Sequence, residues 1–238
     1  MPEALVPIAD NVWLYPADAN GNRVEPNVGV IATGRGTVLV DAGNSPRHAR
    51  RIAHALNAAQ LPPVSHILYT HHHWDHVFGA QVFSAPAVAH ELSRELLLER
   101  AARPWSYTFI EEEIRRNPAT EAMYMAMHRA IDDWHGFYVV VPSLTFTHGL
   151  TLHVDGMRFD LEHVGGQHAP DSVVVRVGGV AFVGDCYYKP VQMNRTVEST
   201  SDRALAARLL ADESIRYYVD GHTPTPQPRA EFARFTEA

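Results

Sequence analysis

The chain has 238 residues, a formal net charge of -7 at pH 7, and hydrophobic side chains at 46% of its positions. This composition is typical of a globular protein with a sizeable buried core. The acidic balance, without a lysine or arginine stripe, argues against a nucleic-acid groove. No segment approaches the ~20 apolar residues that a membrane span requires.

The single cysteine, Cys186, excludes an intramolecular disulfide framework and fits a reducing compartment. Residues 1–5 lack the basic segment and long apolar run of a signal peptide. We therefore expect a cytoplasmic protein.

The first third of the chain alternates strands with a helix. Two β-branched runs, Val28–Ala32 and Thr37–Asp41, flank a glycine-rich turn and predict a β-hairpin. A Ser-Pro pair then opens a predicted helix over residues 45–60. A buried strand follows at His66–Thr70. Strand, helix and strand in this order indicate an α/β layer architecture.

Four histidines and an aspartate follow this strand directly, in the sequence T-H-H-H-W-D-H of residues 70–76. Neutral imidazole and carboxylate are the ligands that zinc and similar metals prefer. Side chains alternate in an extended segment, so His71 and His73 point the same way. A turn after His73 can bring Asp75 and His76 to a second, adjacent ion. One ion with an open position needs three protein ligands, so four clustered candidates suggest a two-metal centre. A histidine-rich surface loop or a cloning tag is the alternative, but this cluster is internal and contains an acid.

Residues 90–141 differ from the rest and are predicted to be a helical insertion. We expect the insertion to cover the active site. Its aromatic side chains are candidates for a cavity wall: Trp105, Tyr107, Phe109, Trp134, Phe137 and Tyr138. Met123 and Met127 lie on one helical stripe, for which simple packing is the favoured interpretation.

The segment 173–185 repeats the pattern of 28–41, with apolar strand, glycine turn, apolar strand and terminal aspartate. The two aspartates are Asp41 and Asp185. This indicates an internal duplication, with chance similarity between two common hairpins as the alternative. A further hairpin turn at Asp155-Gly156 and two late helices are also predicted, at Arg203–Leu210 and Arg229–Phe235.

Three later residues stand where ligands would complete the site. His168 lies in a glycine-led loop before a strand, and Asp185 and His222 each follow a predicted strand. Strand ends at one sheet edge are where α/β proteins place ligand chemistry. Singly each histidine is unremarkable, but together with the cluster at 71–76 they supply the missing ligands.

With these motifs in order, the chain resembles the metallo-β-lactamase superfamily. The opening V-D-A-G, the H-x-H-x-D-H signature, the loop histidine, the G-D and the terminal G-H all match, whereas residues 90–141 match no motif of the family. The resemblance implies a single domain over residues 1–238 with a four-layer αββα sandwich.

The resemblance also implies the ligands of two metal ions. His71, His73 and His168 would hold the first ion. Asp75, His76 and His222 would hold the second, with Asp185 bridging the two. Asp41 would be a buried carboxylate that orients ligands. The implied cofactors are two Zn²⁺ ions, with iron or manganese also compatible with these ligands.

The sequence departs from the family pattern at the third motif. Gln167 stands where the family has glycine, and Ala169 where it has a hydroxyl residue, which makes His163 a rival for His168. Cys186 is a rival for Asp185, because class B β-lactamases use a cysteine ligand near this point. Lys189 would then bind a carboxylate. We prefer Asp185, since a bridging carboxylate completes a two-metal site.

The expected activity is hydrolysis of a small ester, lactone, thioester or amide by a hydroxide that bridges two zinc ions. Asp75 would be the catalytic residue that orients this hydroxide and carries a proton. Tyr187 or Tyr188 could donate to a developing oxyanion, although packing is the favoured interpretation. An iron-dependent oxidoreductase similar to persulfide dioxygenases, and a class B β-lactamase, are the alternatives. The expected partner is a small molecule, without nucleic acid or membrane, and the oligomeric state is left open.

Overall fold

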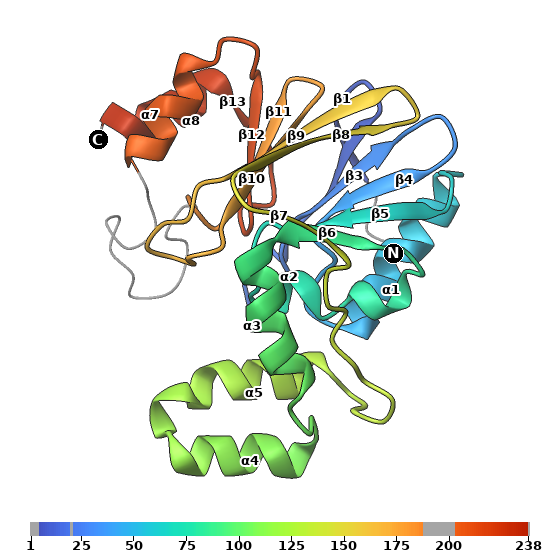
Figure 1. The fold of residues 1–238 in the computed structure, drawn as a ribbon, viewed down its shortest axis with the longest axis vertical. Coiled ribbons are helices and arrows are strands. Elements are labelled where there is room, and N and C mark those ends of the chain that lie inside the picture. The colour runs from blue at the N-terminus through green and yellow to red at the C-terminus, as the bar shows by residue number, and fades with distance from the viewer. Residues whose placement is uncertain (1–4, 20, 188–202, 238) are drawn as a thin grey trace.

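The computed structural model describes residues 5–19, 21–187 and 203–237, whose strands form two sheets (Figure 1). The first sheet has the order β1-β2-β3-β4-β5-β6-β7. Its strands are β1 Val6–Ala9, β2 Val12–Tyr15, β3 Val28–Ala32, β4 Thr37–Val40, β5 Val64–Leu68, β6 Ala87–His90 and β7 Leu144–Phe146. The second has the order β13-β12-β11-β10-β9-β8, with β8 Gly149–Val154, β9 Met157–His163, β10 Val173–Val177, β11 Val180–Gly184, β12 Tyr217–Asp220 and β13 Gln227–Pro228.

Helices cover the outer face of each sheet, and further helices form the insertion between residues 90 and 141. They are α1 Pro46–Ala58, α2 Trp74–Val77, α3 Glu91–Ala101, α4 Tyr107–Arg116, α5 Glu121–Ala130, α7 Arg203–Ala211 and α8 Arg229–Glu237, with short 3-10 turns at Ala80–Val82 and Pro118–Thr120. The predicted cap of α1 is present, because the Ser45 side chain accepts a hydrogen bond from the His48 amide and Pro46 begins the helix. None of the helices in the described ranges is long and apolar enough to cross a bilayer.

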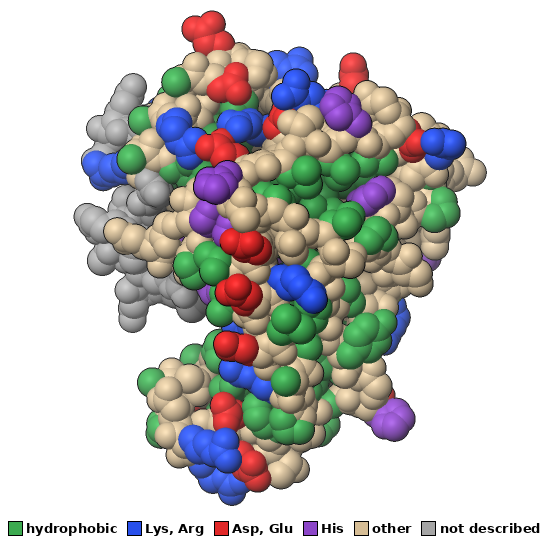
Figure 2. Space-filling view, viewed as in Figure 1, with side chains coloured by type: hydrophobic (Ala, Val, Ile, Leu, Met, Phe, Trp, Pro, Cys, Tyr) green, Lys and Arg blue, Asp and Glu red, His purple; other side chains and the backbone are tan. Residues whose placement is uncertain are grey.

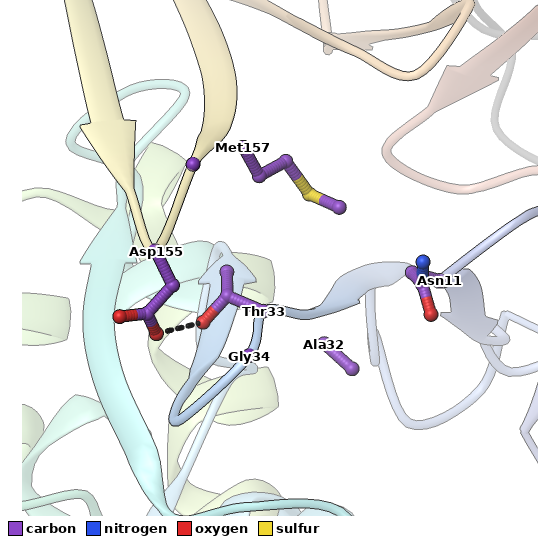
Figure 3. Close-up of a pocket in the computed structure, with 7 residues that line it drawn as sticks. Asn11, Ala32, Thr33, Gly34, Asp155 and Met157 are labelled. Carbon is purple, nitrogen blue, oxygen red and sulfur yellow. Dashed lines mark hydrogen bonds between the residues drawn. The ribbon is translucent and has the colours of Figure 1, made fainter.

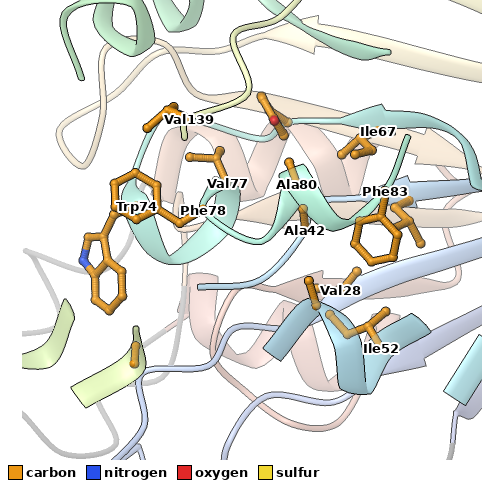
Figure 4. Close-up of a cluster of buried hydrophobic side chains, with 14 of the residues drawn as sticks. Val28, Ala42, Ile52, Ile67, Trp74, Val77, Phe78, Ala80, Phe83 and Val139 are labelled. Carbon is orange, nitrogen blue, oxygen red and sulfur yellow. The ribbon is translucent and has the colours of Figure 1, made fainter. Parts of the chain in front are cut away.

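Three apolar clusters separate the layers. The middle cluster joins the two sheets and includes Val38 and Val40 from β4, opposite Val175 and Phe182. A second cluster packs the outer face of the first sheet against α1 and α2, and Figure 4 draws part of it, including Val28, Ile52 and Phe78. The third packs the outer face of the second sheet against α7 and α8. The order is therefore helix, sheet, sheet, helix, which confirms the predicted αββα fold class.

Burial on both faces explains the continuous apolar runs of the central strands. In β4, Val38 and Val40 face the other sheet, whereas Leu39 faces the helical side. Gly29 lets the sheets approach, because a Cβ at this position would lie 2.6 Å from Cε1 of Phe182. A sheet with both faces covered has little room for polar positions along its central strands.

The two predicted hairpins occupy equivalent places in the two sheets. β3 and β4 pair antiparallel, and β4 then pairs in parallel with β5 after α1. In the second sheet β10 and β11 pair antiparallel, and β11 pairs in parallel with β12. Asp41 and Asp185 each follow the second strand of their hairpin. The shared arrangement agrees with the internal duplication suggested by the sequence.

The helices predicted between residues 90 and 141 connect β6 to β7, which pair in parallel at the edge of the first sheet. Figure 1 shows α4 and α5 projecting away from both sheets, with α3 leading to them. Trp105 stacks on Trp134 with ring centroids 5.6 Å apart, and Phe78 from the end of α2 contacts Trp105 and Phe137. These aromatic side chains anchor the insertion to the core, while Tyr138 is exposed.

A depression opens at the end of the sheets where β4 begins, between the β3–β4 and β8–β9 turns (Figure 3). Asp155 projects from the second turn, and its carboxylate accepts hydrogen bonds from Oγ1 of Thr33 and Nε of Arg35. The acid is thus satisfied by the neighbouring turn and acts as a cross-link between the sheets. The site residues lie at the opposite end of β4, beyond Asp41.

Candidate metal centre

The sequence 71–76 changes from extended chain to helix within the cluster. β5 ends at Leu68, two residues before the predicted end of this strand, and α2 begins at Trp74. His73 occupies the N-cap position with extended backbone angles. His71 and His73 therefore project from extended chain, whereas Asp75 and His76 project from the first turn of the helix.

The remaining candidates come from the second sheet. His168 lies in the loop between β9 and β10, Asp185 follows β11, and His222 follows β12. β11 and β12 are parallel, with Gly184 opposite Asp220, so their carboxyl ends meet at one edge. This register brings Asp185 and His222 together.

All seven predicted ligands converge in three overlapping groups, within each of which the ligand atoms lie within 4.8 Å of one another. The first ligand group is His71, His73 and His168; the middle group is His71, His76 and Asp185; the second ligand group is Asp75, His76 and His222. His71 and His76 each belong to two groups, so the three groups form one continuous cluster.

Asp185 lies at the centre of this cluster. Its Oδ2 is 3.2 Å from Nε2 of His168 and 3.2 Å from Nε2 of His222, and its Oδ1 is 3.3 Å from Nε2 of His76. On the side of the second group, Oδ2 of Asp75 is 3.4 Å from Nε2 of His222. One carboxylate thus faces both groups, which is the position that a bridging ligand requires.

Several ligand atoms of the cluster are buried without a hydrogen-bond partner in the described part of the chain: Nε2 of His71, Nε2 of His76 and Oδ1 of Asp185. Leaving a buried polar atom unsatisfied costs on the order of 1–3 kcal/mol. Imidazole nitrogens and carboxylate oxygens gathered in this way match the donor set of zinc and related divalent ions. The residues present therefore fit a metal centre.

The electrostatics differ between the two outer ligand groups. Burial opposes the shift, but the carboxylate of Asp185 raises the pKa of His76 and of His222 above the usual value, whereas the pKa values in the first ligand group are lowered. Burial, together with neighbouring imidazoles, lowers the pKa of His71 well below its usual value and that of His73 to about 4. Both rings are neutral at pH 7, as metal ligation requires. Burial opposes ionisation of Asp185, yet His222 and His76 hold the pKa of this carboxyl well below its usual range.

Access to the cluster is uneven. The side chains of His76 and Asp185 are 0% and 5% exposed, whereas those of His168 and His222 are 15% and 27% exposed. Asp75 keeps 11% of its side chain exposed. A small molecule would therefore approach from the side of His168, Asp75 and His222.

Asp41 stands behind the second ligand group. Its carboxylate accepts hydrogen bonds from the amide and hydroxyl of Thr70, both at 2.8 Å, and lies 2.7 Å from Nδ1 of His76. Asp41 adopts a positive φ of 63°, a conformation that Asp and Asn tolerate better than most residues. It contacts a ligand from behind, in the orienting position expected from the family resemblance.

The structure separates the rival candidates. His163 ends β9, where its Nε2 lies 2.9 Å from the carbonyl of Pro170 and its ring stacks on His90, so it lies outside all three groups. Cys186 and Tyr187 are buried in the apolar cluster beneath α7 and α8. Tyr188 and Lys189 lie outside the described residues.

Sequence reasoning missed the residues that shape the turn of His222. The buried carboxylate of Asp220 accepts hydrogen bonds from the His222 and Thr223 amides and from the side chain of Gln227. Burial raises the pKa of Asp220 to about 6. The available signal was an aspartate two residues before the ligand, which is the spacing of an Asx turn.

It also missed the partner of His72, the histidine between two ligands. Nδ1 of His72 lies 2.7 Å from the buried carboxylate of Asp171, which also accepts a hydrogen bond from Ser93. Side-chain alternation implies that His72 points away from His71 and His73, and so needs a partner elsewhere.

Comparison with known proteins identifies the family and the fold. Residues 21–222 match the model of the metallo-beta-lactamase superfamily. No curated protein matches the sequence. Among solved structures, the fold is similar to that of the metallo-beta-lactamase from Pontibacter korlensis, with a TM-score of 0.67 and 17% identity over 98% of this chain and 96% of that one. It is also similar to the metallo-beta-lactamase from Hirschia baltica, with a TM-score of 0.65 and 17% identity over 100% of this chain and 97% of that one. The metallo-beta-lactamase from Erythrobacter litoralis has a TM-score of 0.64 and 19% identity over 100% of this chain and 96% of its own. The family match covers most of the chain, and the chain belongs to the metallo-beta-lactamase superfamily.

Proposed function

We propose that this chain is a hydrolase that uses two divalent metal ions, preferably zinc, to cleave a small ester, lactone, thioester or amide. The observation that carries the proposal is the continuous cluster of seven ligand side chains around Asp185, with buried ligand atoms that have no other partner among the described residues. Five imidazoles and two carboxylates suit zinc, and the partly exposed side chains of His168 and His222 give solvent access to the cluster.

Each residue then has a defined role. His71, His73 and His168 would hold one ion, Asp75, His76 and His222 would hold the other, and Asp185 faces both of these groups. When bound, such a pair of ions lowers the pKa of a water molecule and polarises the bond to be cleaved. Asp75 orients the attacking water and carries its proton to the leaving group, because it is the acid of the cluster that keeps contact with solvent.

The donor set favours this assignment over a thiolate site of the class B β-lactamase kind. Cys186 is absent from the ligand groups of the described residues and is packed among apolar side chains, whereas Asp185 faces both outer groups. The similar solved structures are described as metallo-beta-lactamases, but at 16–19% identity their likeness supports only the fold. β-Lactams therefore belong in the substrate panel as one candidate class among several.

We also propose a small-molecule partner and a cytoplasmic location. The net charge of -7 disfavours binding to nucleic acid. On the face drawn in Figure 2, acidic and basic side chains are interspersed, without a continuous basic patch.

The test combines metal analysis of the purified protein with a panel of lactone, ester, thioester, phosphodiester and β-lactam substrates. We expect about two zinc ions per chain and turnover of a carbonyl substrate. Asp75→Asn should reduce kcat by roughly 10²–10⁴-fold, while Asp160→Asn, an exposed carboxylate on β9, serves as the control. A protein that carries only iron and is inert towards every substrate of the panel would overturn the zinc hydrolase in favour of an oxidoreductase.

A further inference from the structure

One buried carboxylate near the ligands has no place in the ligand groups. Asp171 is 0% exposed and lies three residues after His168, in the loop between β9 and β10. Its Oδ1 is 2.7 Å from Nδ1 of His72, and its Oδ2 accepts a hydrogen bond of 2.6 Å from the hydroxyl of Ser93. A buried carboxylate is costly unless it is bonded in this way, so its position is strongly determined.

The three partners belong to three different segments. His72 lies between the ligands His71 and His73, Asp171 shares a loop with the ligand His168, and Ser93 lies in the first turn of α3, where the helical insertion begins. One side chain thus joins both segments that supply the first ligand group to the insertion.

The contact between Asp171 and His72 acts on the ligands through ring contacts. The His72 ring packs edge-on against that of His73, with centroids 4.7 Å apart. Nδ1 of His73 in turn lies 2.9 Å from Nε2 of His168. By holding His72 in one orientation, Asp171 fixes the surface against which His73 rests and the distance between the two ligand-bearing segments.

A second set of contacts joins the same loop to the start of α3. His90 caps this helix through Nδ1, which accepts from the Leu92 amide, and its ring stacks on His163 at a centroid distance of 3.6 Å. Nε2 of His163 is 2.9 Å from the carbonyl of Pro170, the residue before Asp171. The start of the insertion and the loop of His168 are therefore connected by two independent routes.

We propose that Asp171 is the positioning residue of the first ligand group, and that Ser93 ties the helical insertion to it. The inference rests on the proposed function, because it requires that this group holds a metal ion. One buried carboxylate thus stands behind each outer group: Asp41 contacts the ligand His76 directly, whereas Asp171 acts through His72, the neighbour of the ligand His73. The geometry at His73 and His168 consequently depends on the placement of α3, which gives the insertion a direct connection to the metal centre.

The experiment measures the affinity of each ion separately in the full-length protein. The metal-free protein is titrated with Zn²⁺ against a chromophoric chelator and with Co²⁺ while its absorption spectrum is recorded. His168→Ala and His222→Ala serve as references, since they identify the spectral component of the first and the second ion. Asp171→Asn, Ser93→Ala and the double variant are then compared with the wild type.

We expect Asp171→Asn to reduce the affinity for the first ion by roughly 10–100-fold, as is typical for residues that support a ligand. The variant should also alter the spectral component that is missing in His168→Ala. The second ion should bind within about twofold of the wild type, a readout that general destabilisation would not produce. Ser93→Ala should reduce the affinity for the first ion by a smaller factor. The loss of affinity in the double variant should be smaller than the two single losses combined, because both residues act through one carboxylate.

The inference is overturned if the wild type binds two ions and Asp171→Asn binds both with unchanged affinity and spectrum. A wild type that binds no ion instead defeats the proposed function, and the inference with it. If Asp171→Asn does not fold, Ser93→Ala decides: an unchanged first-ion affinity and spectrum in this variant overturn the proposal, whereas a selective loss at the first ion supports it.

Discussion

Nδ1 of His76 lies 2.7 Å from Oδ2 of Asp41, which leaves Nε2 of the same ring directed at Asp185, 3.3 Å away. An ionised carboxylate accepts from Nδ1 and so fixes the tautomer in which Nε2 is the free ligand atom. The same carboxylate holds the amide and hydroxyl of Thr70, the residue before the ligands. Asp41 therefore determines the ring orientation of His76 and the path of the chain that leads to it.

Asp41→Ala and Asp41→Asn should separate these two effects. Alanine leaves the Thr70 donors and His76 without an acceptor and is strained at positive φ, so we expect a loss of unfolding free energy on the order of 3 kcal/mol. Asparagine tolerates this φ and retains one oxygen, but it no longer fixes the tautomer, and affinity for the second ion should fall roughly tenfold. Urea unfolding of the metal-free variants and zinc competition measure the two quantities. Identical behaviour of the two variants would contradict this division of roles.

Gly221→Ala should disrupt the metal centre without touching a ligand. A Cβ at Gly221 would lie 2.0 Å from Oδ1 of Asp185 and 2.9 Å from Cε1 of His76, so the carboxylate must move. We expect at least a 100-fold loss of activity on the best substrate, since a small misplacement of catalytic groups costs about this much.

Gly34→Ala is the matched control for this substitution. Its nearest contact would be Cβ of Asp155 at 3.6 Å, an ordinary van der Waals distance. Its activity should equal that of the wild type, and its stability should change by no more than about 0.5 kcal/mol. Normal metal content and turnover in Gly221→Ala would show that Asp185 has more freedom than the packing implies.

Removal of metal should lower thermal stability. Chelation leaves the buried imidazoles and carboxylates of the cluster without their counter-charge, and any ligand that binds only the folded state stabilises it. At a free concentration 100 times Kd the expected stabilisation is about 2.7 kcal/mol, or roughly 5–10 °C in Tm for a chain of this size. Differential scanning fluorimetry after EDTA treatment tests this. Zn²⁺ should restore the Tm and Mg²⁺ should not, and equal restoration by both would count against a nitrogen-rich site.

Acid should destabilise the protein through His48, which lies far from the ligands in sequence. Burial, with Arg51 and Arg23 nearby, lowers the pKa of this imidazole from its ordinary 6.5 to about 3. As the pH falls below 6.5, this histidine is protonated in the unfolded chain but stays neutral in the folded chain. The unfolding free energy is therefore highest above pH 6.5 and decreases as the pH falls towards 3. The slope is about 1.4 kcal/mol per pH unit.

His48→Asn removes this titration and places its Oδ1 where Nδ1 of His48 accepts from the Asn44 amide, 3.4 Å away. The unfolding free energies of wild type and variant, measured by urea titration at several pH values, should diverge by roughly 2–3 kcal/mol in favour of the variant between pH 6.5 and 4.5. A constant difference across this range would mean that His48 is protonated in the folded state.

The sequence predicted much of the framework, because its signals are local. Ser45 and Pro46 begin α1 as expected, and both hairpins form where glycine turns separate β-branched runs. The predicted strand His66–Thr70 lies two residues too late, since β5 spans Val64–Leu68. The Tyr69 amide still bonds to the carbonyl of Val88, but the Thr70 amide turns to the carboxylate of Asp41, a partner that no local pattern reveals.

The ligands that share one motif were predictable from the sequence. The contacts that depend on packing between distant segments were less so. His168 was preferred over its rival His163 because residues 169–172 lead straight into the next strand. In the structure this loop closes through hydrogen bonds from the Val164 and Gly165 amides to the carbonyl of Ser172, which leaves His163 at the end of β9 and His168 at the tip. The contact between His72 and Asp171 spans 99 positions of sequence and follows only from the packing of the two sheets.

The ligands are widely separated in the sequence, from residue 71 to residue 222. During synthesis, the histidines at 71–76 leave the ribosome long before His222 does. Until then they are a short chelating peptide with no second sheet against which to close. Complete metal uptake therefore waits until residue 222 has been synthesised, and shortening the chain before residue 222 should abolish it even where the first sheet has already folded.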